Sequence, residues 1–142
     1  MKHFSRMVSL LLAVVMVLAV PAAAMENENA RASSFFGSSD VYLYKTSSTK
    51  FQAWFEVTAL DWMDKLGASE IKIQESSDGE NWTTVKTFSR SNYSDMIATN
   101  TGFHGATLSC DVASGYYYRA YVTFYGKNGS GQGEKYFYTE II

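Results

Sequence analysis

The stretch KFQAWFEVTAL, residues 50–60, decides the fold class because its apolar and polar side chains alternate. One face of this stretch carries Phe51, Ala53, Phe55 and Val57. The other face carries Gln52, Trp54, Glu56 and Thr58. Successive side chains of a β-strand point to opposite faces, so this period of two predicts a half-buried strand with one apolar face.

The same period returns along the rest of the chain, in short runs bounded by turn residues. Besides 50–60, we expect strands over 41–45, 70–76, 82–88, 103–112, 116–125 and 134–141. Asp78-Gly79 is the strongest hairpin signal among the turns. About seven short strands with regular turns predict an all-β fold. The expected architecture is a two-sheet antiparallel β-sandwich of the fibronectin type III or immunoglobulin-like class.

Two segments interrupt the alternation. In DWMDKLGAS (61–69) the apolar residues recur at a spacing of three, Asp61 is a capping residue and Gly67 a terminating one. This pattern predicts one helical turn that crosses between strands. The polar segment 89–102 predicts a loop.

The first 24 residues have the pattern of a secretory signal peptide. Lys2 and Arg6 precede an apolar run over 7–20, and Ala22 and Ala24 are small residues at the −3 and −1 positions of a cleavage site. The apolar run is shorter than the roughly 20 residues of a membrane-spanning helix, so no stable membrane anchor is expected. Cleavage after Ala24 and a secreted, extracellular protein are predicted.

A second A-x-A sequence leaves cleavage after Ala32 as the alternative. With cleavage after Ala24, residues 25–40 form a flexible leader and 41–142 form the β-sandwich domain. The length suits one domain.

Removal of Lys2 and Arg6 reduces the 12 basic residues to 10, against 14 acidic ones. This balance argues against nucleic acid as a partner. Cys110 is the only cysteine, so no internal disulfide stabilises the fold, and its place in an alternating run predicts a buried thiol.

Two longer motifs resemble known proteins. The segments IKIQESSDGENWTTVKTF (71–88) and SGYYYRAYVTFYGKNGSGQG (114–133) resemble the second half of a fibronectin type III domain. That resemblance implies that Tyr116 takes the place of the tyrosine-corner residue. Together with Arg31-Ala32-Ser33 and Gly67-Ala68, these segments also resemble a group of small exported bacterial proteins of unknown function. This second resemblance implies a bacterial source and no assigned activity.

Catalytic and metal chemistry have few candidates in the sequence. After signal removal one histidine remains, His104, and its separation from Cys110 along one strand is too large for a hydrogen bond. Asp61, Asp64 and Glu75 are the carboxylates considered for glycoside hydrolysis. Asp78 and Glu80 are too few oxygen ligands for calcium. We therefore expect no catalytic residue, no metal and no cofactor.

The tyrosines near the C-terminus are the candidate binding residues. Along 116–125, alternate residues from Tyr116 to Phe124 are expected to fill the core. The residues between them, with two on the last strand, are expected on an outer face. The predicted binding residues are Tyr117, Arg119, Tyr121, Tyr125, Tyr136 and Tyr138. Cross-strand aromatic pairing that only stabilises the sheet is the alternative interpretation.

A tyrosine-rich outer face on a chain with few catalytic groups favours a non-catalytic exported binding module. Tyrosine combines apolar area, a hydroxyl group and a low entropy cost, which suits an extracellular glycan or protein as partner. A secreted structural protein that assembles through its strand edges is one alternative, so oligomerisation is possible. A small carboxylate-dependent hydrolase is the other.

Overall fold

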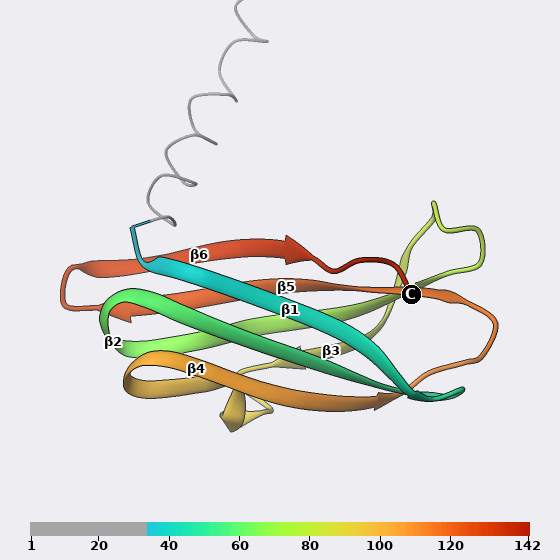
Figure 1. The fold of residues 1–142 in the computed structure, drawn as a ribbon, viewed down its shortest axis with the longest axis horizontal. Helices are drawn as coiled ribbons and strands as arrows, with labels where there is room; N and C mark the ends of the chain where they lie inside the picture. The colour runs from blue at the N-terminus through green and yellow to red at the C-terminus, as the bar shows by residue number, and fades with distance from the viewer. Residues whose placement is uncertain (1–33) are drawn as a thin grey trace, which may run out of the picture. The chain divides into compact units, whose positions relative to one another are not determined.

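The structure, a computed structural model, describes residues 34–142, and these form an all-β antiparallel fold. The six strands are β1 (Phe36–Ser47), β2 (Lys50–Ser76), β3 (Thr83–Ser89), β4 (Ile97–Asp111), β5 (Tyr117–Asn128) and β6 (Gly131–Tyr138). One short 3₁₀ turn, Ser94–Met96, precedes β4. All six strands belong to one hydrogen-bonded sheet (Figure 1). No α-helix is present between residues 34 and 142.

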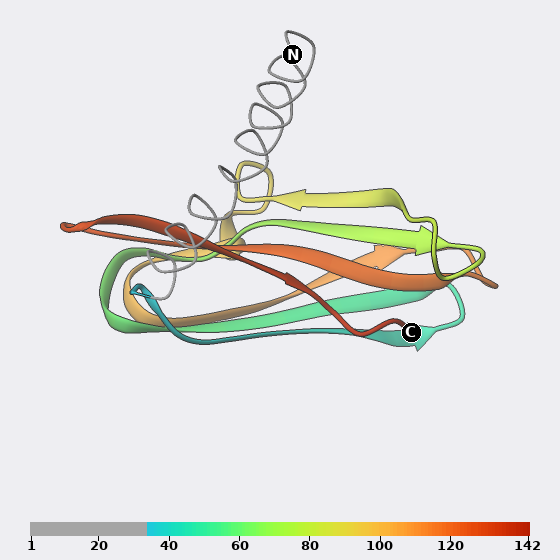
Figure 2. The same cartoon turned by 90° about the horizontal axis from the view of Figure 1, so that it is seen from above.

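The long strand β2 organises the sheet. Its first half pairs with β1 on one side and β4 on the other. Its second half pairs with β3 and β5, and β5 in turn pairs with β6. The sheet curls like half of a barrel, so that the two halves of β2 lie in different layers (Figure 2).

The core lies between these layers. The alternation in residues 50–60 is confirmed, because its four apolar residues are all buried. The Phe51 ring meets the edge of Tyr118 on β5 at 4.7 Å between centroids, and Phe55 meets Phe124 at 6.1 Å. Aromatic pairs in edge-to-face geometry add to the stabilisation that burial alone provides. The first half of β2 therefore packs against β5 although both strands belong to the same sheet.

The expected sandwich of about seven strands in two sheets is not confirmed, since the structure has six strands in one sheet. The strands expected over 50–60 and 70–76 are the two ends of the single strand β2. Their layers face each other as in a sandwich, but the hydrogen bonding continues from one layer to the other through β2. The curl of one long strand thus replaces a connection between two sheets.

The helical turn expected over residues 61–69 is wrong. Residues 63–67 pair with residues 97–101 of β4, and residues 65–68 pair with β5. Met63 and Leu66 are buried, whereas Trp62 is exposed. Ladder hydrogen bonds on both sides satisfy more backbone groups than one isolated turn, and that explains why the strand continues.

Two loop boundaries also differ from expectation. The segment predicted as a loop over 89–102 already enters β4 at Ile97. Residues 36–40, expected in the flexible leader, belong to β1, where Phe36 is part of the core. The predicted signal peptide, its cleavage site and residues 25–33 of the leader lie outside the described residues.

The resemblance implied that Tyr116 holds the corner before β5, whereas the hydroxyl that contacts this corner belongs to Tyr118. The Tyr118 hydroxyl oxygen lies 2.7 Å from the Ala113 carbonyl oxygen and 3.1 Å from Glu75 Oε2, so its one hydrogen is shared between two acceptors. Burial and the Glu75 carboxylate raise the pKa of Tyr118 to about 12. Tyr116 precedes β5 and is exposed, so the core face of this strand begins two residues later than the sequence suggested.

Candidate functional site

Three tyrosines gather on the outer surface of β5 and β6. The antiparallel register sets Tyr121 opposite Tyr138 and Thr123 opposite Tyr136. The Tyr121 ring stacks on Tyr136 with centroids 6.0 Å apart and planes 7° apart, and it contacts Tyr138 at 4.8 Å. Tyr136 and Tyr138 are 53% and 55% exposed. We call Arg119, Tyr121, Tyr136 and Tyr138 the tyrosine face.

Arg119 extends the tyrosine face toward β3. Its guanidinium carbon lies 4.3 Å from the Trp82 ring centroid and 4.4 Å from that of Tyr138. The Nε donates to Gln74 Oε1 at 2.8 Å, which fixes the side chain along the sheet. A guanidinium stacks on aromatic rings without losing its in-plane N–H donors. Among residues 34–142, no carboxylate lies within ion-pair distance of Arg119.

Trp82 is the residue of this site that sequence reasoning missed. It immediately precedes β3, whose register sets Thr84 opposite Gln74 of β2. This placement carries the indole across β2 to Arg119 on β5. The available signal was the alternation within WTTVKTF (82–88), which puts Trp82 and Thr84 on one face of the predicted strand.

A hollow lies beside the tyrosine face, between β6 and the loop that follows β3. Its volume is about 530 Å³, and its charged lining residues are Glu70, Lys72, Arg90 and Glu134. The rings of Tyr121 and Tyr136 form its aromatic wall. Apart from these two rings the lining residues are all polar or charged, so the hollow is a polar surface with one aromatic wall.

Two of the charged side chains in the hollow, Lys72 and Glu70, form an ion pair. Lys72 Nζ lies 2.8 Å from Glu70 Oε1, and that carboxylate raises the pKa of Lys72. Burial among the neighbouring groups raises the pKa of Tyr121, so its hydroxyl stays protonated at neutral pH. The tyrosine face therefore offers the protonated hydroxyl of Tyr121 and the cation of Arg119.

Four of the six predicted binding residues come together in the structure, and two do not. Tyr125 is only 6% exposed, because Arg90 stacks over its ring at 4.4 Å and its hydroxyl donates to Gln132. The prediction that Tyr125 lies on an accessible surface is wrong. Tyr117 is 51% exposed, but it lies at the first residue of β5, near the 77–81 turn.

A second aromatic pair lies on the outer surface of the other layer. Tyr42 of β1 stacks on Trp54 of β2 with centroids 5.4 Å apart. Tyr42 is exposed, and the register sets the two residues opposite each other. Among residues 34–142 no cation stacks on either ring of this pair, so it provides an internal comparison for the tyrosine face.

The catalytic candidates stay apart from one another. His104 Nε2 lies 2.7 Å from the Asp95 carbonyl oxygen, and Cys110 is a buried free thiol. Burial raises the pKa of Cys110, which disfavours the reactive thiolate. Glu75 is at the end of β2 and accepts from Tyr118, whereas Asp61 and Asp64 are exposed in the middle of that strand.

Of the two residues considered for calcium, Asp78 uses its carboxylate in hydrogen bonds within the turn after β2. Asp78 Oδ1 accepts from Ser76 Oγ and from the backbone N–H groups of Glu80 and Asn81, while Oδ2 accepts from Asn81 Nδ2. These donors lower the pKa of Asp78. The carboxylate closes the turn between β2 and β3. Within residues 34–142, no group of three or more His, Cys, Asp or Glu side chains is placed to hold a metal ion.

Comparisons with protein-family models, curated proteins and solved structures find no match to this chain. No helix in the described part of the chain is long and apolar enough to cross a membrane.

Proposed function

We propose that the protein is a non-catalytic exported module that binds a glycan carrying an anionic group. The observation that carries this proposal is the position of Arg119, stacked between Trp82 and Tyr138 within a row of exposed rings. Export itself follows from the signal-peptide pattern of residues 1–24 and belongs to the proposal.

Stacked tyrosines suit a sugar ring. A pyranose presents a face of C–H groups that packs on an aromatic ring, and its hydroxyls exchange hydrogen bonds with phenol groups. Tyr136 and Tyr138 present exposed ring surface with Tyr121 between them. Because β5 has β2 on one side and β6 on the other, and the Tyr121 ring contacts both Tyr136 and Tyr138, these rings lose little freedom on binding.

Arg119 adds the preference for an anion. The guanidinium planes are covered by aromatic rings and Nε donates to Gln74, which leaves the edge formed by the two Nη groups for an anion. That edge matches the two oxygens of a carboxylate, as in a uronic acid. Lysine would keep the charge but not the planar fork.

The proposal is tested by pull-down of residues 25–142 with insoluble cell wall, mucin and plant polysaccharides. We expect wild-type protein to bind at least one of them and a Tyr121→Ala/Tyr138→Ala variant to lose about ten-fold or more in affinity. A change of that size corresponds to about 1.4 kcal/mol, within the range for truncation of aromatic contact residues.

A Tyr42→Ala variant is the matched control, because it removes an exposed stacked tyrosine from the other layer. Circular dichroism checks that both variants stay folded. Loss of binding in the control alone would move the site to the Tyr42–Trp54 pair. Absence of binding by wild-type protein to every polysaccharide would refute the proposal.

Edge-to-edge assembly is the second candidate function, and the free outer edges of β1 and β6 favour it. Unpaired strand edges are templates for pairing with another chain. This function predicts oligomers whose share rises with concentration in sedimentation velocity. A single monomer species at high concentration would exclude it.

A further inference from the structure

The open edges of β1 and β6 face each other across a groove. In the sheet order these are the two end strands, so each has one hydrogen-bonding edge without a partner strand in the described part of the chain. Both strands run in the same direction along the groove (Figures 1 and 2). The groove has a volume of about 290 Å³. That is near the lower end of the range of about 300–1,000 Å³ for ligand pockets.

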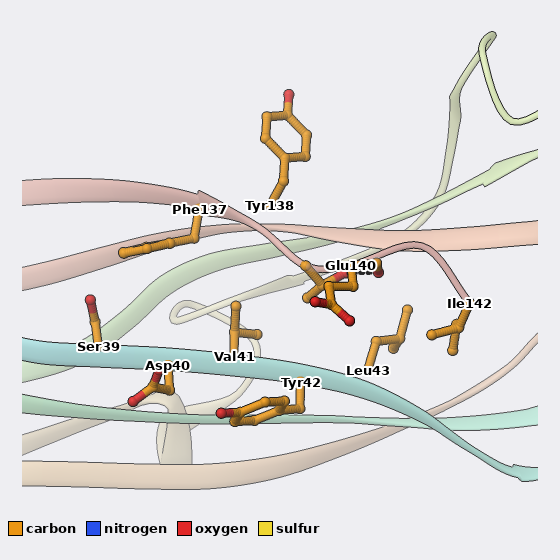
Figure 3. Close-up of a pocket in the computed structure, with 10 residues that line it drawn as sticks. Ser39, Asp40, Val41, Tyr42, Leu43, Phe137, Tyr138, Glu140 and Ile142 are labelled. Atoms are coloured by element: carbon orange, nitrogen blue, oxygen red, sulfur yellow. Dashed lines mark hydrogen bonds between the residues drawn. The ribbon is translucent and has the colours of Figure 1, made fainter.

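The groove has an apolar floor with an acidic rim. Val41 and Leu43 project from β1, with Phe137 and Ile142 on the opposite side (Figure 3). The C-terminal residues stay attached to β5, because the backbone of Ile142 exchanges two hydrogen bonds with Tyr118, at 2.9 and 3.0 Å. This attachment keeps the end of the chain on the β5 side and leaves the β1 edge open.

Ser39 gives the groove a buried polar atom without a hydrogen-bond partner. Its side chain points from β1 toward β6 (Figure 3), and the residue is only 9% exposed. Its Oγ has no hydrogen-bond partner, alone among the buried side-chain polar atoms of residues 34–142. A buried hydroxyl without a partner costs about 1–3 kcal/mol, so a backbone group that enters the groove and pairs with Ser39 Oγ would remove that cost.

We propose that this groove accepts an extended peptide segment of a partner protein, which adds a strand between β1 and β6. Backbone groups of the two open edges would bind such a segment on both sides, as in other cases of strand addition. A strand that runs antiparallel to both edges satisfies β1 and β6 at once. Its alternate side chains would enter the apolar floor and its backbone would reach Ser39 Oγ.

The charges on the groove define the partner. Asp40 and Glu140 line it, and no lysine or arginine does. An extended segment with alternating apolar residues and at least one basic residue complements this lining. A folded second copy of the chain fits less well, since each end strand that it could insert has one free edge, whereas an extended peptide has two, one for β1 and one for β6.

The probe for the test is the peptide KVTVKVTVK, acetylated and amidated, added to isotope-labelled residues 25–142. We expect the backbone amide signals of residues 39–43 and 137–139 to shift on titration. The acidic peptide EVTVEVTVE should bind at least ten-fold more weakly. A peptide with proline at its centre should also bind weakly, because proline removes a backbone donor.

Two variants separate this site from general edge binding. Val41→Arg places a charge and bulk on the floor of the groove and should abolish binding of KVTVKVTVK. Val85→Arg makes the same change at an exposed position of β3, another strand that pairs on one side only, and should leave binding unchanged.

Ser39→Ala keeps the proposal testable if Val41→Arg does not fold. Removal of an unpartnered hydroxyl should leave the melting temperature unchanged or raised, while peptide affinity falls about 2- to 10-fold through the lost hydrogen bond. A purely structural serine would not give this opposite response. Equal affinity for both charged peptides, shifts confined to the tyrosine face, or edge signals that change with protein concentration alone would overturn the proposal.

Discussion

At the scale of single residues, Gly67 permits the closest approach in the sheet. Its φ of +155° lies in a region that side chains disfavour, and its Cα faces the backbone at the start of β4. A Cβ here would overlap the Met96 carbonyl oxygen and crowd the His104 ring. The bend of β2 therefore depends on a residue without a side chain.

Substitution of Gly67 with alanine tests this role. We expect Gly67→Ala to lower the free energy of unfolding by about 2–4 kcal/mol, since the backbone must shift to admit the methyl group. Urea denaturation measures the change. Gly102→Ala is the control, because a Cβ at Gly102 meets no atom within 4 Å, and its effect should stay within about 0.5 kcal/mol. Equal effects of the two substitutions would contradict the account.

Asp78 makes the stability of the fold depend on pH in the acidic range. Its folded-state pKa is lowered by the donors of the turn, below the usual unfolded value of about 3.9. The unfolded chain therefore binds a proton at this group before the folded chain does. The stabilisation is fully present above about pH 5 and is lost as the pH falls below about 4, toward the folded-state pKa.

Asp78→Asn should accordingly lower the melting temperature at pH 7, and the difference from wild type should shrink below pH 4. Asp64→Asn changes an exposed carboxylate on β2 outside the turn and serves as the control. Thermal unfolding followed by circular dichroism at several pH values measures both. A difference that stays constant from pH 7 to pH 2.5 would count against the role of the turn.

At the scale of elements, the sequence pattern predicted the strands well and their connections less well. The alternation around Phe51 and the Asp78-Gly79 turn gave correct local structure because both signals are local. The helical turn predicted over 61–69 was wrong, because apolar residues spaced by three also fit a bent strand. At the bend, side chains from both faces of the strand can reach the core. Partners on β4 and β5, far away in the sequence, decide that segment.

The corner at the start of β5 links two of these elements. Tyr118 holds the 113–115 turn through Ala113 and the end of β2 through Glu75. Tyr118→Phe should lower the free energy of unfolding by about 1–2 kcal/mol, because the hydroxyl shared between Ala113 and Glu75 is lost while the packing on Phe51 remains. Tyr116→Phe, at an exposed position, should have almost no effect in the same chemical denaturation. A larger effect at Tyr116 would place the corner where the resemblance implied.

At the scale of the whole molecule, the described residues form one curled sheet whose outer surfaces differ. The sequence predicted an outer face with Arg119, Tyr121, Tyr136 and Tyr138, because strand parity alone sorts these residues. It did not predict Trp82 or the cover of Arg90 over Tyr125, since both arise from the β2–β3 pairing. It also did not predict the groove between β1 and β6, which depends on how far the sheet curls.

The most direct test of the central claim is a glycan array that pairs uronic-acid oligosaccharides with their neutral counterparts. Residues 25–142 would be compared with an Arg119→Gln variant that has the same circular dichroism spectrum. The account predicts that wild-type protein binds at least one carboxylated glycan more strongly than its neutral pair, and that Arg119→Gln removes this preference. Absence of glycan binding, or a preference for the acidic glycan that survives in the variant, would contradict it.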